Sequence, residues 1–134
     1  MAENKTELKA GLSFCLRRGR LLIHHATIKA LDDPEYIRFL LNEKEKCIAI
    51  QRCEAIDRDR FKVPIWREGT KDSFEITSIP FLSLIYKRCE WDLNKSFLVY
   101  GNVYPKHRLV EFDLRTSVEI NVDQFVDPEN GRPE

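Results

Sequence analysis

The sequence predicts a single, mostly β domain with two short helices (α+β), in which duplicated β-α-β-β units form one small barrel. Three observations predict this fold class. Apolar and polar residues alternate over 36–51 and 95–114, as in strands that face a core on one side. Residues 79–91 carry the clearest helical spacing in the chain. A strand, a helix and a hairpin follow one another in the same order in each half.

The first half-unit is expected to span residues 16–53 and to follow a flexible N-terminal arm over residues 1–13, which are polar and mixed in charge. Residues 16–24 suit a strand, because their apolar centre is short and bounded by charged residues. Residues 26–31 suit a short helix, because two apolar side chains three positions apart share one face.

The stretch 34–46 allows two interpretations. As a helix, it would be capped by Asp33 and would have Pro34 at its first position. As part of a hairpin over 36–51, it would alternate apolar and polar residues, turn at residues 42–46 and return. The second half of the chain repeats the order strand, helix, hairpin, and this repetition favours the hairpin.

The second half-unit is expected to span residues 72–114. Residues 72–78 alternate as in a strand. The helix predicted over 79–91 has a proline in its first turn and basic residues near its negative end. Its last residue, Trp91, is expected to anchor the helix to the hairpins. Residues 95–114 are expected to form two strands around a loop.

A charged crossover joins the two half-units. Its apolar stretch 61–66 is expected to be an edge strand or a packed crossover, because Pro64 lacks the N–H group that a central strand needs. Residues 14–122 are thus expected to form one domain, and residues 123–134, which show no periodicity, a mobile tail.

Composition narrows the function classes. The chain has 134 residues and a formal net charge of +0, but residues 1–67 hold 14 Lys+Arg against 10 Asp+Glu, whereas residues 68–134 hold 8 against 12. Its apolar runs are too short for a membrane span or a signal peptide, so a cytoplasmic protein without a membrane partner is expected. The spacing of the four cysteines favours reduced, structural thiols over zinc ligands or disulfides: Cys15, Cys47, Cys53 and Cys89.

One segment carries a family resemblance. Residues 19–23 read Gly-Arg-Leu-Leu-Ile and are followed by Lys29, Leu31 and an expected strand-turn-strand. Over about 35 residues this order resembles the AbrB-like (SpoVT/AbrB) transition-state regulator domain. The duplicated arrangement resembles the tandem MraZ-like relatives of that domain, in which two half-units in one chain build one barrel. The family's usual proline and glycine are replaced here by His24 and Asp32.

The resemblance implies DNA binding by the basic first half-unit, through Arg17, Arg18, Arg20 and Lys29. Arginine can pair bidentately with phosphates or with guanine edges, and Gly19 permits a turn or a close backbone approach. The alternative interpretation of the same residues is a solvated strand edge that its charges protect from aggregation.

Other polar residues indicate no active site. His24 and His25 are adjacent and would point to opposite faces of a strand, so they cannot easily share one metal ion, and one of them is expected in or near the core. Asp57 and Asp59 are expected to face water, and His107 to lie in an exposed loop. The chain has no phosphate-binding glycine loop and no nucleophile elbow, so an enzyme is not expected, nor is a cofactor.

Two functions from different classes follow. The first is a DNA-binding protein, a transcription regulator that contacts duplex DNA with its basic first half-unit. The alternative is a protein-protein interaction module, antitoxin-like or homodimeric, without nucleic-acid binding. The zero net charge and the missing arginine before the second half-unit's strand favour this alternative.

Overall fold

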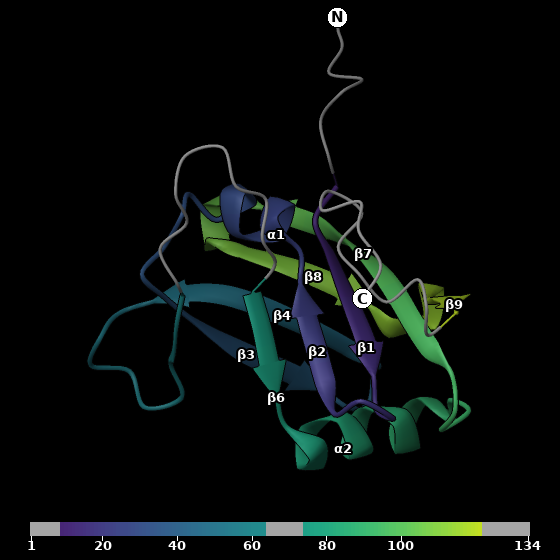
Figure 1. Cartoon of the computed structure of the whole chain (residues 1–134). Coiled ribbons are helices and arrows are strands. Elements are labelled where there is room, and N and C mark those ends of the chain that lie inside the picture. The colour runs from purple at the N-terminus through teal and green to yellow at the C-terminus, as the bar shows by residue number, and fades with distance from the viewer. Residues whose placement is uncertain (1–8, 64–73, 122–134) are drawn as a thin grey trace, which may run out of the picture.

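The computed structural model describes residues 9–63 and 74–121 and is mostly β with two α-helices (Figure 1). The elements in chain order are β1 (Gly11–Cys15), β2 (Arg20–Ile23), α1 (His25–Ala30), β3 (Tyr36–Asn42), β4 (Cys47–Cys53), β5 (Phe61–Lys62), β6 (Phe74–Thr77), α2 (Ile79–Cys89), β7 (Ser96–Tyr104), η1 (Pro105–His107), β8 (Leu109–Asp113), η2 (Leu114–Thr116) and β9 (Val118–Ile120). Both η elements are single 3₁₀ turns.

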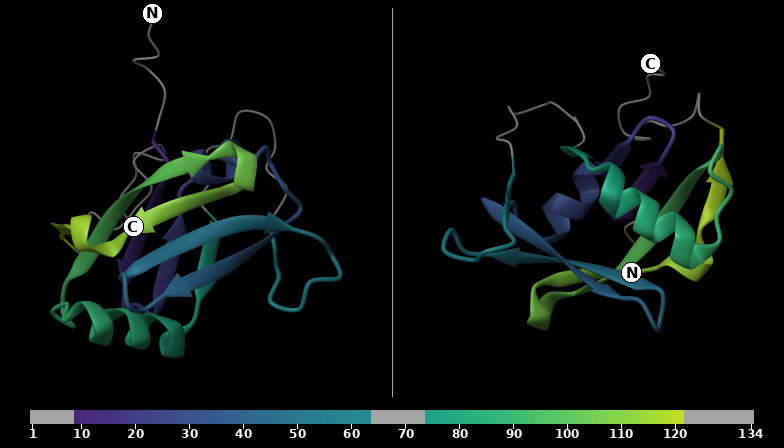
Figure 2. Two further views of the ribbon diagram at one scale, coloured as in Figure 1. Left: turned by 180° about the vertical axis from the view of Figure 1, so that it is seen from behind. Right: turned by 90° about the horizontal axis from the view of Figure 1, so that it is seen from below.

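The nine described strands form one antiparallel sheet in the order β5-β3-β4-β8-β7-β1-β2-β6, with β9 paired to β7. Figure 2 shows the sheet curling on itself into a half barrel, with α2 lying across one end. The short helix α1 lies at the opposite end, where β2 finishes (Figure 1). No helix in the described ranges is long and apolar enough to cross a membrane.

One core is shared by both halves of the chain. In β4, Ile48 and Ile50 are fully buried, whereas Cys47, Ala49 and Gln51 are half-buried, so the strand shows the alternation of a sheet with one covered face. In the register of β4 and β8, Ile48 pairs with Phe112 and Ile50 with Val110, which are also fully buried. The β4-β8 pairing therefore brings the apolar faces of the two hairpins into the same interior.

The hairpin predicted over residues 36–51 is confirmed, and the helical interpretation of residues 34–46 is wrong. Strands β3 and β4 pair along their whole length, from Tyr36 opposite Cys53 to the turn. The turn is closed by the Asn42 side chain, whose Oδ1 accepts a hydrogen bond from the Glu45 N–H at 3.1 Å. The alternation of apolar and polar residues therefore predicts this segment correctly, whereas Asp33 and Pro34 do not start a helix here.

The start of the domain differs from the prediction. Strand β1 already begins at Gly11, so residues 11–13 belong to the sheet and not to an arm over residues 1–13. The strand predicted over residues 16–24 is in fact the β1–β2 turn, residues 16–19, followed by β2. All five residues of β1 are buried, because the strand lies between β7 and β2 in the sheet.

The two predicted helices are confirmed. Helix α1 begins one residue earlier than expected, and α2 ends two residues earlier. Ser78 caps α2, since its Oγ accepts a hydrogen bond from the Phe81 N–H at 3.3 Å. Glu90 ends the helix in a left-handed conformation, with φ at 56°. These end signals are local, which explains why the sequence predicts α2 well.

Trp91 fastens α2 to the sheet, as expected. Its ring stacks on Phe97 of β7 at a centroid distance of 4.3 Å. The same ring meets Phe14 of β1 at 5.3 Å and Tyr86 of α2 at 5.1 Å, both edge-on. The tryptophan therefore joins the helix, the central strand β1 and the second hairpin.

Several predictions concern the ends of the chain and the crossover. Strand β5 pairs only with β3 and lies at one edge of the sheet, so the edge strand predicted over residues 61–66 is confirmed where it is described. The remainder of that stretch, most of the arm and the tail over residues 123–134 lie outside the described residues. The order strand, helix, hairpin occurs in both halves, as β2-α1-β3-β4 and β6-α2-β7-β8.

Candidate functional site

The β1–β2 turn presents two of the predicted DNA-binding residues, Arg17 and Arg18, and both are exposed. The Gly19 N–H closes the turn by donating to the Leu16 carbonyl at 2.9 Å. Gly19 has a φ of 68°, which favours glycine, and a Cβ at this position would lie 2.5 Å from the Ile79 side chain. The turn therefore sits tightly against the first residue of α2, with its arginines directed to solvent.

Arg20, the third predicted residue, is engaged by a carboxylate. Its Nη1 lies 3.1 Å from Glu75 Oε2, and about two-fifths of each side chain is exposed. The two residues come from neighbouring strands, since β2 and β6 are antiparallel partners. This ion pair neutralises the positive charge that the sequence placed beside the turn.

Lys29, the fourth predicted residue, does not join the others. Its Nζ lies 3.2 Å from Asp33 Oδ2 in an exposed ion pair. Strand β2, which rises about 13 Å over its four residues, separates α1 from the turn. Figure 1 shows α1 and the β1–β2 turn at opposite ends of the sheet. The structure thus brings Arg17 and Arg18 together, leaves Arg20 beside them in an ion pair, and places Lys29 elsewhere.

Helix α2, which contacts the start of the turn, carries a further exposed positive charge. Tyr86 of α2 accepts a hydrogen bond from the Leu16 N–H at 3.3 Å, which places the helix under the start of the turn. The next residue, Lys87, is exposed. Within residues 9–63 and 74–121, no carboxylate lies within ion-pair distance of Arg17, Arg18 or Lys87. We call these three residues the turn surface.

The prediction that one of the two adjacent histidines is buried is confirmed, and it is His24. Its Nε2 is hydrogen-bonded to Ser13 Oγ at 2.8 Å, and both residues are at most 2% exposed. Thr27 lies beside this pair and both accepts from the Gly11 N–H and donates to the Gly11 carbonyl. A substrate cannot reach a serine and histidine so deeply buried, so this cluster fastens α1 to β1 and is not a catalytic dyad.

The structure gives the surroundings of the acidic loop after β4 and of His107. Asp57 Oδ2 accepts a hydrogen bond from the Glu54 N–H at 2.7 Å, and its other oxygen lies 4.0 Å from Arg38. Asp59 and His107 are exposed. Among the described residues, no three histidine, cysteine or acidic side chains lie close enough together to hold a metal ion.

Cys47 makes a contact that the sequence did not indicate. Its Sγ donates a hydrogen bond to Glu111 Oε2 at 3.0 Å, across the pairing of β4 with β8. Burial raises the pKa of the Cys47 thiol to about 12, helped by the hydrogen bond and the negative charge of Glu111. Only the thiolate is a good nucleophile, so the raised pKa predicts slow reaction of this cysteine near neutral pH. All four cysteines are free.

Glu111→Gln is expected to speed the alkylation of Cys47 by iodoacetamide at pH 9 by at least about tenfold. The substitution removes the carboxylate that disfavours the thiolate, so the pKa of Cys47 falls and more thiolate is present. Peptide mass spectrometry against time measures the rate. Asp113→Asn is the matched control, because Asp113 also raises this pKa but makes no hydrogen bond to the thiol. Equal rates in wild type and Glu111→Gln would contradict the assignment.

Comparison with known proteins adds no relative: no family model, no curated protein and no solved structure matches this chain. The resemblance to the AbrB-like domain therefore rests on the sequence motif, and function must be argued from the turn surface and the fold.

Proposed function

We propose that this protein binds duplex DNA through the turn surface and acts as a transcription regulator. The observation that carries the proposal is the pair Arg17 and Arg18, both exposed, adjacent and free of carboxylates among the described residues. A guanidinium group offers planar donors that match phosphate oxygens, and lysine adds a point charge. Lys87 extends the positive charge onto α2.

The turn is held in place before any ligand binds. The Tyr86 hydroxyl accepts from the Leu16 N–H and donates to the Lys95 carbonyl at 2.6 Å, so the residue before the arginines is tied to α2 and to the loop before β7. Gly19 closes the other side of the turn against Ile79. Fewer backbone conformations are lost on binding when the contacting loop is already ordered.

Arg20 and Lys29 have lesser roles in this proposal. An exposed ion pair such as that of Arg20 with Glu75 contributes at most about 1 kcal/mol, so a phosphate can replace the carboxylate. Lys29 lies at the other end of the sheet and touches no DNA that is bound at the turn surface.

The strand pairings support the finer proposal that the chain is a tandem, AbrB-like duplication. Exchanging β1 with β5, β2 with β6, β3 with β7 and β4 with β8 converts the β1-β7 pair into β5-β3 and the β3-β4 pair into β7-β8. The β2-β6 and β4-β8 pairs map onto themselves. The β1-β2 pair is the exception, because the exchange turns it into β5-β6 and these two strands do not pair within the described residues. Such a two-fold exchange is what two fused half-units would produce, each lending strands to the other.

The test is binding to a fluorescent DNA duplex of mixed sequence, followed by anisotropy at several salt concentrations. The double variant Arg17→Ala/Arg18→Ala is expected to bind at least about tenfold more weakly at low salt, and its salt slope is expected to fall by about 2, one for each phosphate that the variant no longer neutralises. Lys29→Ala/Arg58→Ala is the matched control, because it removes the same charge from exposed positions outside the turn surface.

Two results would overturn the proposal. If both double variants weaken binding equally, the effect is one of overall charge and the turn surface is not the site. If the wild-type protein binds no duplex even at low salt, DNA binding itself is wrong.

The rival function is a protein-protein interaction module, and the free sheet edges favour it. Strands β5 and β6 each pair on only one side within the described residues, which leaves backbone groups able to accept another strand. A protein that sediments as a dimer at micromolar concentration and fails to bind DNA would replace the first proposal with this one.

A further inference from the structure

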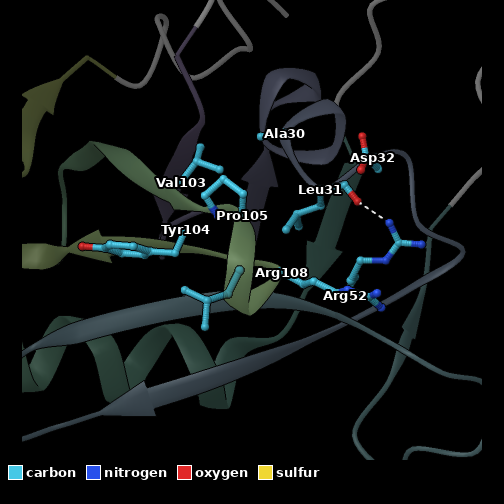
Figure 3. Close-up of a pocket in the computed structure, with 9 residues that line it drawn as sticks. Ala30, Leu31, Asp32, Arg52, Val103, Tyr104, Pro105 and Arg108 are labelled. Carbon is cyan, nitrogen blue, oxygen red and sulfur yellow. Dashed lines mark hydrogen bonds between the residues drawn. The ribbon is translucent and has the colours of Figure 1, made fainter.

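A pocket lies at the end of the molecule opposite the β1–β2 turn, between the end of α1, strand β4 and the β7–β8 hairpin (Figure 3). Its volume is about 220 Å³. Leu31, Val103 and Pro105 give it an apolar wall, and Arg52 and Arg108 supply two guanidinium groups. No residue of the turn surface contributes to it, so the pocket is independent of the proposed DNA-binding site.

The two arginines are linked through the backbone but lack a carboxylate partner. The Arg52 N–H donates to the Arg108 carbonyl at 3.1 Å, which fixes the spacing of the two residues. The Arg52 guanidinium donates to the Leu31 carbonyl at 2.9 Å and leaves its other donors unused by described residues. In the described part of the chain, neither arginine forms an ion pair.

Asp32 lines the same pocket and adds a carboxylate to the groups that could meet a ligand there. Its carboxylate forms no ion pair with either arginine, whereas the next residue, Asp33, is paired with Lys29. Two guanidinium groups and one carboxylate leave a positive excess, together with one strong hydrogen-bond acceptor. A phosphate group fits this set, because near neutral pH it carries negative oxygens for the arginines and can keep one P–O–H group for the carboxylate.

Two residues that line the pocket have a left-handed backbone. Outside glycine, five described residues have a left-handed φ, and two of these, Asp32 at 64° and Arg108 at 55°, line the pocket. Asp33, at 48°, follows directly. Strained backbone of this kind gathers at ligand clamps, where the surrounding structure holds it in place.

The geometry points to a binding site for a small phosphate, held by Arg52 and Arg108 with Asp32 accepting from its protonated oxygen. The volume is below the range of about 300 to 1,000 Å³ typical of drug-sized ligands, so it suits inorganic phosphate or the phosphate group of a small monoester. Tyr104 contributes its ring and not its hydroxyl, which Figure 3 shows turned away from Arg52.

The test is a titration of the ¹⁵N-labelled full chain with inorganic phosphate and, separately, with glycerol phosphate, followed by amide chemical shifts. Saturable shifts are expected at Asp32, Arg52 and Arg108. Sodium acetate, which lacks a protonated oxygen at neutral pH, is expected to bind at least about tenfold more weakly. Sodium chloride at matched ionic strength controls for screening. Saturation by glycerol phosphate as well as by phosphate would assign the site to the esters too.

Arg108→Ala is the decisive variant, because Arg108 is exposed and its loss leaves the Arg52 hydrogen bond to Leu31 intact. We expect the apparent Kd for phosphate to rise at least about tenfold in this variant and to remain unchanged in the control Arg58→Ala. Shifts that do not saturate, that chloride reproduces, or that persist unchanged in Arg108→Ala would overturn the assignment. These readouts do not involve DNA, so failure here is distinct from failure of the turn surface.

Discussion

Gly101→Ala is expected to destabilise the fold by about 3 kcal/mol, near the upper end of what overpacking a core costs. Gly101 of β7 pairs directly with Phe112 of β8, and an added Cβ would lie 2.6 Å from the Phe112 ring and 2.7 Å from the Val110 side chain. Both neighbours are fully buried, so neither can move away into solvent. Urea unfolding followed by circular dichroism measures the loss as a lower transition midpoint.

Phe112→Leu supplies the control for Gly101→Ala, because leucine removes ring atoms that the new methyl group would meet. The leucine variant is itself expected to lose stability, but the double variant should lose at least about 1 kcal/mol less than the sum of the two single losses. Strictly additive losses would show that the methyl group does not meet the ring.

Thr27→Val is expected to cost about 2 kcal/mol, the second-largest effect. Thr27 is fully buried, and its Oγ1 accepts from the Gly11 N–H at 2.8 Å and donates to the Gly11 carbonyl at 2.9 Å. Valine keeps the shape but leaves the Gly11 N–H without this partner, and an unpaired buried donor costs about 1 to 3 kcal/mol. The carbonyl keeps a second donor, the His24 N–H at 3.1 Å.

Thr27→Ser distinguishes the contribution of the Thr27 hydroxyl group to stability from that of its methyl group. Serine retains the hydroxyl group but lacks one buried methyl group, so the free energy of unfolding is expected to fall by about 1 kcal/mol. Thermal and urea unfolding should therefore rank wild type above serine and serine above valine. A valine variant as stable as the serine variant would mean that the hydrogen bonds to Gly11 contribute nothing.

Much of the fold could be predicted because its signals are local. The hairpin β3-β4 follows from alternation, and α2 follows from its apolar spacing, its first-turn proline and its basic end. Strand β1 could not be predicted in this way. Its residues are buried on both faces, Ser13 included, so it shows no alternation, and its partner β7 lies in the other half of the chain.

The candidate site was predicted in part. Arg17 and Arg18 are neighbours in the sequence, and a turn keeps them together. Lys29 and Asp33 are four residues apart, so their ion pair could have been predicted from the sequence. The ion pair of Arg20 with Glu75 could not, because it depends on the pairing of β2 with β6.

The pocket arginines depend on the distant pairing of β4 with β8 in the same way. Arg52 follows the last β4 residue that pairs with β8, and Arg108 precedes the first residue of β8. Nothing in the sequence around either arginine reveals the other.

Because β1 is flanked by β2 on one side and by β7 on the other, the sheet cannot be completed until the second half of the chain has been synthesised. The ribosome releases β1 long before β7 is synthesised, and until then one edge of β1 has no strand to pair with, although β2 and α1 can already pack against it. Pairings between such distant segments form slowly and leave nascent chains prone to aggregation. The open edge of β1 is therefore the part of the sheet that waits longest for its partner, and β7 closes it by pairing over Gly11–Phe14.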